Sequence, residues 1–90
     1  MTQNNTINTV EVRKEYYATG ALLSEIPYVN GERHGITKEY YSSGALYAEV
    51  PYVKGKAHGV KKHYDKDNSN IDRLTLYNSG REVVSVMTNI

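Results

Sequence analysis

Three histidines are the side chains of this 90-residue chain that are best suited to binding a metal ion. His34 and His58 occupy equivalent positions of an internal repeat, and His63 follows close behind. Stacked repeats would place His34 beside His58, but two imidazoles without a fixed third ligand make a poor zinc site. We therefore interpret them as turn residues that recur because the unit recurs, and we expect no metal ion and no cofactor.

The polar segment DKDNSN at residues 65–70 carries oxygen atoms on alternate side chains, as a calcium-binding loop does. Such a loop needs glycine at its sixth position and a bidentate glutamate at its twelfth. This chain has Asn70 and Leu76 at those two positions. The pattern is therefore typical of a polar connecting loop rather than of a calcium site.

The residues that catalysis would require are missing or repeated. The chain has no cysteine, and its carboxylates recur along the sequence instead of forming one isolated pair in contrasting environments. Recurring residues are what a scaffold needs, whereas an active site rarely repeats itself. The sequence predicts a protein that is not an enzyme and that has no catalytic residues.

In each copy a lysine lies two residues before a tyrosine, and these lysines are Lys14, Lys38 and Lys62. Such a ladder could stack a single strand of nucleic acid. A formal net charge of only +1 argues against that partner, and lysine stems packed along a sheet explain the pattern more simply. We expect no nucleic-acid binding.

Two further features concern where the protein is found. No apolar run is long enough to cross a bilayer, so we expect no membrane insertion. The polar first ten residues lack the basic-then-apolar order of a signal peptide, and the absence of cysteine suits a reducing compartment. We therefore expect a cytoplasmic protein.

Residues 12–35 and 36–59 are tandem copies in which more than half of the aligned residues are identical. A weaker third copy covers residues 60–83, with one extra residue in its polar loop. A terminal strand follows, so that residues 12–88 form one repeat domain. Residues 1–9 are polar and aperiodic, and we expect them to be a flexible tail.

Glycines recur about every dozen residues, while tyrosine and β-branched residues dominate between them. Pro27 and Pro51 interrupt the remaining stretches, so strands and turns are favoured over helices. The sequence predicts an all-β fold, an antiparallel meander of about seven strands. Its stacked β-hairpin repeats would form one elongated, twisted sheet.

The middle copy predicts a hairpin closed by the three-residue loop Ser42-Ser43-Gly44. This register would place Tyr40 opposite Leu46 and Lys38 opposite Ala48, and continued without interruption it separates the side chains onto two faces. The first face would carry Ile36, Tyr40, Leu46, Ala48, Val50 and Tyr52, and the second Thr37, Glu39, Tyr41, Tyr47 and Glu49.

Asn30-Gly31 predicts a two-residue turn between the first two copies. Keeping the apolar residues on one face then requires that one residue be absorbed near Gly35, opposite Pro27. We therefore expect Gly35 and its equivalent Gly59 to lie at a bulge or to have a positive φ.

An acidic and aromatic face provides the candidate partner-binding residues, and these are Tyr17, Glu25, Tyr41, Tyr47 and Glu49. Two interpretations stay open. The residues could be cross-strand pairs that keep a solvated face soluble. They could also form a binding surface, because tyrosines are frequent at hot spots and carboxylates suit a basic partner.

The pattern P-Y-x-x-G-x-x-x-G at residues 27–35 and 51–59, with E-Y-Y-x-x-G-x-L before the second, resembles the MORN repeat. It is most similar to the bacterial variant found in the YwqK-type antitoxin group, and the resemblance covers residues 12–80. It implies stacked hairpins that bind another protein, here an immunity protein or antitoxin that neutralises a toxin by direct binding. Because the chain has no tryptophan, which is common in eukaryotic MORN repeats, phosphoinositide binding is not implied.

The alternative is a structural or scaffolding repeat protein. Such a protein would assemble into a homo-oligomer through an edge strand or through the apolar face of its sheet.

Overall fold

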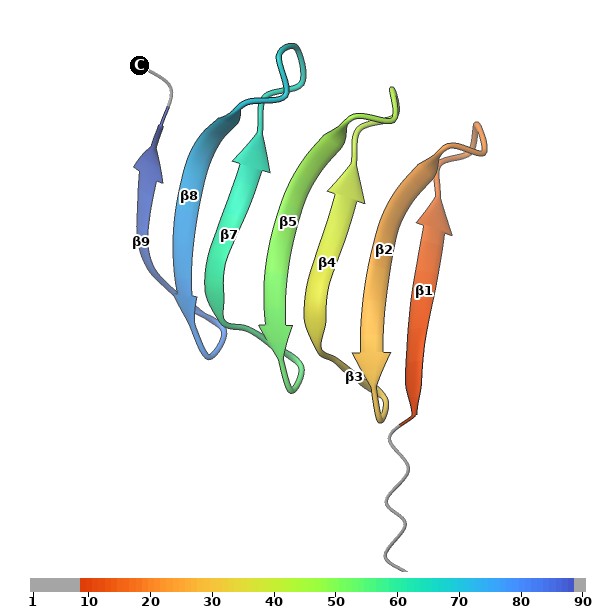
Figure 1. The fold of residues 1–90 in the computed structure, drawn as a ribbon, viewed down its shortest axis with the longest axis vertical. Helices are drawn as coiled ribbons and strands as arrows, with labels where there is room; N and C mark the ends of the chain where they lie inside the picture. Colours follow the sequence, from red (N-terminus) through yellow and green to blue (C-terminus); the bar gives the residue numbers. More distant parts are fainter. Residues whose placement is uncertain (1–8, 89–90) are drawn as a thin grey trace, which may run out of the picture.

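The computed structural model describes residues 9–88, and these form a single antiparallel sheet (Figure 1). Seven strands follow one another across the sheet in the order β1-β2-β4-β5-β7-β8-β9. The short strand β3 pairs with β2, and the short strand β6 pairs with β5. The strands are β1 Val10–Tyr16, β2 Leu22–Val29, β3 Glu32–Arg33, β4 Gly35–Tyr40, β5 Leu46–Val53, β6 Lys56–Ala57, β7 Gly59–Tyr64, β8 Ile71–Asn78 and β9 Arg81–Met87. The predicted all-β meander of hairpins is confirmed.

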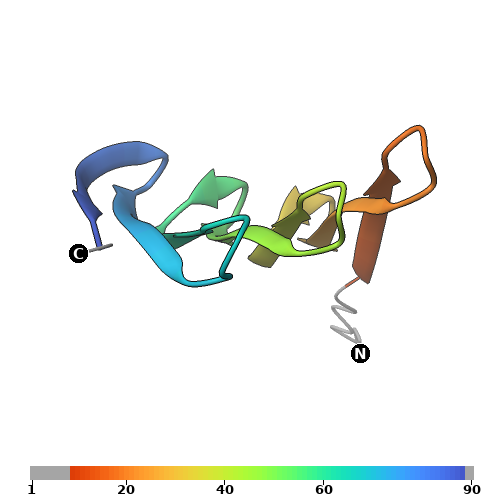
Figure 2. The ribbon, with the colours of Figure 1, turned by 90° about the horizontal axis from the view of Figure 1, so that it is seen from above.

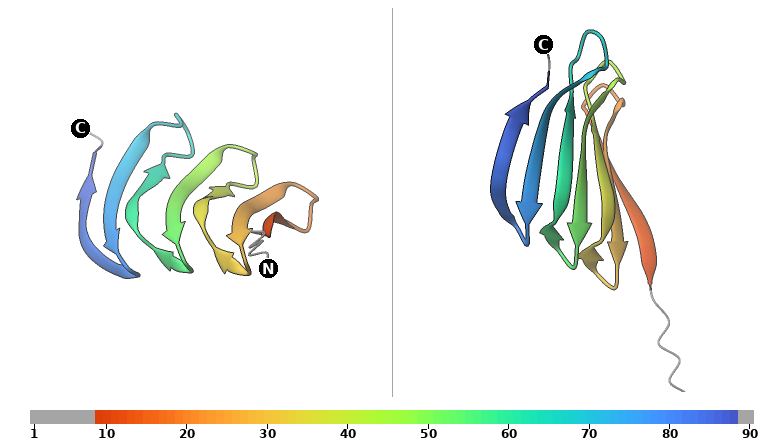
Figure 3. Two further views of the ribbon diagram at one scale, coloured as in Figure 1. Left: turned by 60° about the horizontal axis from the view of Figure 1, so that its bottom comes forward. Right: turned by 60° about the vertical axis from the view of Figure 1, so that its left-hand side comes forward.

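The sheet is a single layer, 16 Å across in its shortest direction. Seen from above, it is bent and twisted, and no other element of residues 9–88 covers either face (Figure 2). The long strands curve along their length (Figure 3). None of the described residues forms a helix that could span a membrane. Of the predicted tail at residues 1–9, all but Thr9 lie outside the described residues.

The hairpin loops form as the sequence predicts. The N–H of Tyr41 donates to the carbonyl of Ala45 at 2.8 Å, which leaves a three-residue loop ending at Gly44, whose φ is +97°. In the third copy the loop is longer, and the Asp65 carboxylate accepts hydrogen bonds from the N–H groups of Asp67 and Asn68. The segment at 65–70 is thus a polar loop that satisfies its own hydrogen-bonding groups.

The predicted assignment of side chains to faces is wrong, because each hairpin contains a bulge. Tyr40 lies opposite Leu46 as predicted, but Glu39 lies opposite Ala48, so that Tyr47 is an extra residue on β5. From there Lys38 lies opposite Glu49 instead of Ala48. A shift of one residue moves every later side chain to the other face. The other hairpins have equivalent bulges at Leu23 and Asp72.

The link between repeats also differs from the prediction in one respect. Asn30 and Gly31 form the two-residue turn, and Gly35 has a φ of +107°, as expected. However, Tyr28 pairs with Arg33 and Glu25 pairs with Lys38. Between these two pairs the chain covers three residues on β2 but five residues on the opposite side. The segment around Gly35 therefore contains two extra residues rather than one. Because side chains alternate with a period of two, the later side chains stay on the same face. The change of face occurs at the Tyr47 bulge instead.

The two faces of the sheet are buried to different degrees. We call one the core face, because it carries all the buried residues of the described chain: Ser24, Ile26, Thr37, Ala48, Val50 and Thr75. We call the other the lysine face, because Lys14, Lys38 and Lys62 lie on it in one row. Beside that row run exposed apolar residues, namely Val12, Ile36, Val60, Leu76 and Val84.

Replacing Thr37 by valine is expected to stabilise the fold. Thr37 is only 2 % exposed and lies opposite Val50, and its Oγ1 has no hydrogen-bond partner among the described residues. A buried hydroxyl without a partner costs about 1–3 kcal/mol, so Thr37→Val should raise the free energy of unfolding by about 1 kcal/mol. Urea denaturation measures this change.

Thr75 provides the matched control for this prediction. It is also buried, but its hydroxyl makes a 3.0 Å hydrogen bond with Ser85 Oγ. Thr75→Val should therefore destabilise the protein or leave it unchanged. An equal gain from both substitutions would show that valine is simply better in a strand and that the unpaired hydroxyl of Thr37 has no cost.

Candidate partner-binding face

On the lysine face, Tyr40 and Tyr64 each connect their repeat to the preceding one. The hydroxyl of Tyr40 donates to Glu25 at 2.6 Å, and that of Tyr64 donates to Glu49 at 2.5 Å. These hydrogen bonds to a carboxylate raise the pKa of each tyrosine to about 12. Glu25 and Glu49 therefore act in holding the repeats together.

The second tyrosine of each pair connects its repeat to the following one. The Tyr17 hydroxyl donates to the carbonyl of Tyr40 at 2.6 Å, and the Tyr41 hydroxyl donates to the carbonyl of Tyr64 at 2.7 Å. These bonds lie near the hairpin tips, beyond the pairing of Ser24 with Glu39 that ends the β2–β4 ladder. They hold the tips together where backbone pairing between the hairpins has stopped.

Two of the three histidines, His34 and His58, connect the turns at the opposite end of the sheet. The Lys54 N–H donates to His34 Nδ1 at 3.3 Å, and the Ser79 N–H donates to His58 Nδ1 at 3.0 Å. Within residues 9–88, no cluster of three His, Asp or Glu side chains is arranged to hold a metal ion. His34 and His58 thus each accept a hydrogen bond from the next turn, which accounts for their recurrence in the sequence.

The five candidate residues do not share one surface. Glu25 and Glu49 lie opposite lysines on the lysine face. Tyr17, Tyr41 and Tyr47 line a hollow on the core face together with Ser24. The prediction that all five lie together is wrong, because the bulge separates Tyr47 from Glu49.

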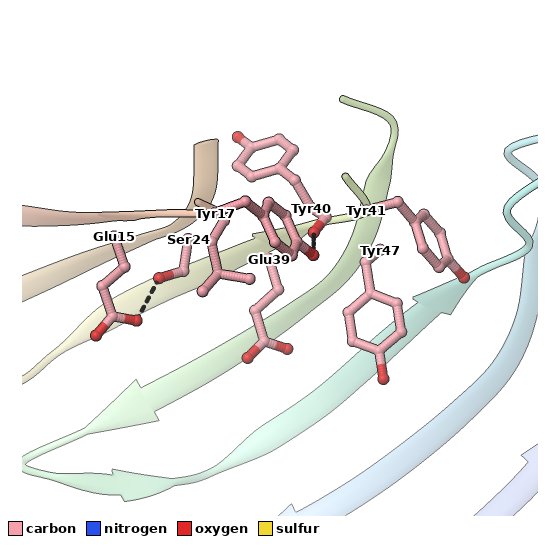
Figure 4. Close-up of a pocket in the computed structure, with 8 residues that line it drawn as sticks. Glu15, Tyr17, Ser24, Glu39, Tyr40, Tyr41 and Tyr47 are labelled. Atoms are coloured by element: carbon pink, nitrogen blue, oxygen red, sulfur yellow. Dashed lines mark hydrogen bonds between the residues drawn. The ribbon is translucent and has the colours of Figure 1, made fainter. Parts of the chain in front are cut away.

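The hollow lies between the first two hairpins and has a volume of about 230 Å³ (Figure 4). The Tyr47 ring meets the Tyr41 ring edge-on, with centroids 5.0 Å apart, and meets the His63 ring in the same way at 4.9 Å. Because the Tyr17 and Tyr41 hydroxyls are already hydrogen-bonded, these rings form fixed walls. Its full lining is Glu15, Tyr17, Leu23, Ser24, Glu39, Tyr40, Tyr41 and Tyr47.

Two carboxylates enter this hollow beside the tyrosines (Figure 4). Glu15 accepts a 2.8 Å hydrogen bond from the Ser24 hydroxyl. Glu39 makes no hydrogen bond and no ion pair within residues 9–88, and it also borders a second hollow next to Val50 and Tyr52. The sequence placed Glu39 on the acidic face but did not distinguish it from the other carboxylates, since its lack of a partner depends on the register.

The third repeat ends this row of carboxylates. His63 takes the position of Glu39, and its Nδ1 lies 2.5 Å from Asp72 Oδ1. Asp72 is the bulge residue of this hairpin, equivalent to Tyr47. The row of glutamates formed by Glu15 and Glu39 is therefore not continued in the third repeat.

The first two repeats agree on the lysine face except at Val12/Ile36, whereas the core face keeps Glu15/Glu39, Tyr17/Tyr41 and Tyr28/Tyr52 but differs at several other positions. The lysine face repeats Lys14/Lys38, Glu25/Glu49 and Pro27/Pro51 without change. The core face differs at Arg13/Thr37, Leu23/Tyr47, Ser24/Ala48 and Arg33/Ala57. Residues that connect repeats must recur, whereas residues that contact another molecule are free to differ. The core face thus carries most of the positions at which the two repeats differ in chemistry.

Comparison with known proteins agrees with this repeat architecture. Residues 12–30 and 33–54 each match the family described as MORN repeat variant. No curated protein and no solved structure was found to be significantly similar to the chain. Over those two segments, which cover β1, β2, β4 and β5, the chain is therefore similar to the MORN repeat variant.

Proposed function

We propose that this protein is a non-enzymatic binding module that holds a basic segment of another protein on its core face. The observation that carries the proposal is the Glu39 carboxylate, which has no partner among residues 9–88 and lies in a hollow lined by tyrosines. The match to a repeat family supports a binding module in general. The hollow supports a particular chemistry.

An arginine or lysine of the partner fits this hollow best. Its charge would pair with Glu39, and its planar or aliphatic part would lie against the Tyr47 ring. Because Tyr17 and Tyr41 are held by their hydroxyl bonds, little side-chain entropy is lost on binding. Aromatic residues that are rigid and partly exposed are typical of interface hot spots.

The partner that we propose is a toxin, which this protein would neutralise in the bacterial cytoplasm by direct binding. The resemblance of the repeats to an antitoxin group supports this role. A toxin that acts on nucleic acid has a basic active site, and the carboxylates of the core face would oppose it. Covering that site would block the toxin without any catalytic step.

Glu39→Gln and Tyr47→Leu are expected to weaken partner binding at least tenfold each. Glu39→Gln removes the charge, and Tyr47→Leu introduces the residue that the first repeat carries at the same position, Leu23. Calorimetric titration with the purified product of a neighbouring toxin-like gene measures the affinity, and a thermal melt of each variant verifies folding.

Lys38→Gln is the control, because Lys38 is exposed on the lysine face and makes no hydrogen bond or ion pair within residues 9–88. Its affinity should equal that of the unchanged protein. Unaltered binding by both core-face variants, or a similar loss in Lys38→Gln, would place the binding surface elsewhere.

A further inference from the structure

Strand β9 forms an unprotected edge of the sheet. Among residues 9–88 it pairs only with β8, and after Arg81 and Glu82 at its start no charged residue follows from Val83 to Thr88. The apolar side chains of this edge are Val83, Val84, Val86 and Met87, which are 57 %, 50 %, 49 % and 60 % exposed. A long apolar edge strand of this kind readily pairs with another strand.

The opposite edge, β1, has the usual protection. Four of its seven residues are charged, namely Glu11, Arg13, Lys14 and Glu15. Charged side chains on an edge oppose pairing with a further strand. The two edges therefore differ in chemistry, and only β9 is suited to an additional partner.

The register shows which backbone groups of β9 are free. Thr88 N–H donates to the carbonyl of Asp72, and Val86 lies opposite Leu74. Since the ladder of an antiparallel pair uses alternate residues, the N–H and C=O groups of Ser85 and Met87 point away from β8. These groups are arranged to continue the sheet.

The repeat itself shows which position of the unit β9 occupies. Val84 lies opposite Leu76, as Val60 does on β7, so that β9 takes the position of the first strand of a fourth unit. The corresponding strands β4 and β7 are paired on both sides. In the residues described, β9 is paired on one side only.

We propose that β9 pairs in antiparallel fashion with β9 of a second copy of this chain, about a two-fold axis at Ser85. In this register Val84 of each copy lies opposite Val86 of the other, and β-branched cross-strand pairs are favourable. No charge opposes another charge anywhere from Val83 to Thr88. A head-to-tail contact with β1 would instead place the apolar edge against a charged one.

A pair of charge variants tests both the contact and its register. Val84→Lys/Val86→Lys places lysine opposite lysine in the dimer, whereas Val84→Glu/Val86→Lys places opposite charges together. Sedimentation equilibrium of the full chain should show a concentration-dependent dimer. The dissociation constant should rise at least tenfold in the first variant and stay within a few-fold in the second.

The matched control is Val10→Lys/Val12→Lys on β1, which should leave the dimer unchanged. A monomer at all concentrations would overturn the proposal, as would equal loss in both β9 variants or loss in the β1 variant. Should a β9 variant fail to fold, hydrogen exchange of the unchanged protein gives the answer. Ser85 and Met87 amides should be protected at high and not at low concentration, and protection that does not depend on concentration would overturn the proposal.

Discussion

Gly59→Val is expected to lower the free energy of unfolding by about 1–3 kcal/mol through backbone strain. Gly59 has a φ of +112°, a conformation that a β-branched residue strongly disfavours. A Cβ atom at this position would also lie 3.2 Å from Pro51 Cγ, in the ring of a residue that cannot move away easily. For a domain of this size, a loss of 1 kcal/mol lowers the melting temperature by about 4–8 °C.

Two further glycine variants separate strain from steric contact. Gly44 has a similar φ of +97°, but a Cβ atom there would meet nothing within 4 Å. Gly44→Ala therefore measures the strain alone, and Gly59→Ala should cost more. Pro51→Ala removes the contacting Cγ, so that combining it with Gly59→Ala should abolish the excess. Urea denaturation gives each value, and equal costs for Gly44→Ala and Gly59→Ala would show that the contact with Pro51 does not matter.

The turns of this protein could be predicted because each is marked by a residue with special backbone chemistry. Gly31 and Gly44 both have a positive φ at the positions where the sequence predicts a turn. The bulges carry no such mark. Leu23, Tyr47 and Asp72 are equivalent residues of three different types, and none of them signals an extra position in a strand. The sequence pattern therefore predicts the single change of face at Gly35, whereas in the structure it occurs at Tyr47.

The candidate site could be predicted only in part for the same reason. Tyr17, Tyr41 and Tyr47 do lie together, because two of them adjoin the loops whose geometry was clear. Glu25 and Glu49 were misplaced, since they follow the bulge in each return strand. The sequence also could not show that their carboxylates are occupied by Tyr40 and Tyr64, which belong to the next repeat.

The contacts between repeats are expected to weaken in alkali, between pH 10 and pH 12. The hydrogen bonds from Tyr40 to Glu25 and from Tyr64 to Glu49 favour the protonated phenol, which raises the folded pKa to about 12 from the ordinary value of 10.0. Below pH 10 both the folded and the unfolded states are protonated, and the stabilisation is fully present. As the pH rises past 10 the unfolded state ionises first, so the stabilisation falls progressively and is lost near pH 12.

The expected loss is about 1 kcal/mol for each tyrosine. Two pKa units correspond to about 2.7 kcal/mol, and the partial exposure of both rings reduces that value through solvent screening. Urea denaturation at a series of pH values from 9 to 11.5 measures the slope. Tyr40→Phe/Tyr64→Phe should be less stable at pH 9 and should lose less stability on the way to pH 11.5.

Tyr16→Phe is the matched control, because Tyr16 is the equivalent of Tyr40 in the first copy and makes no hydrogen bond to a glutamate among residues 9–88. Its side chain is exposed and makes no hydrogen bond within residues 9–88. The alkaline slope of this variant should equal that of the unchanged protein, since lysine ionisation is common to both. An equal slope in the Tyr40→Phe/Tyr64→Phe variant would mean that the two tyrosine–glutamate bonds do not stabilise the stacking of the repeats, because their loss would then leave the alkaline response unaltered.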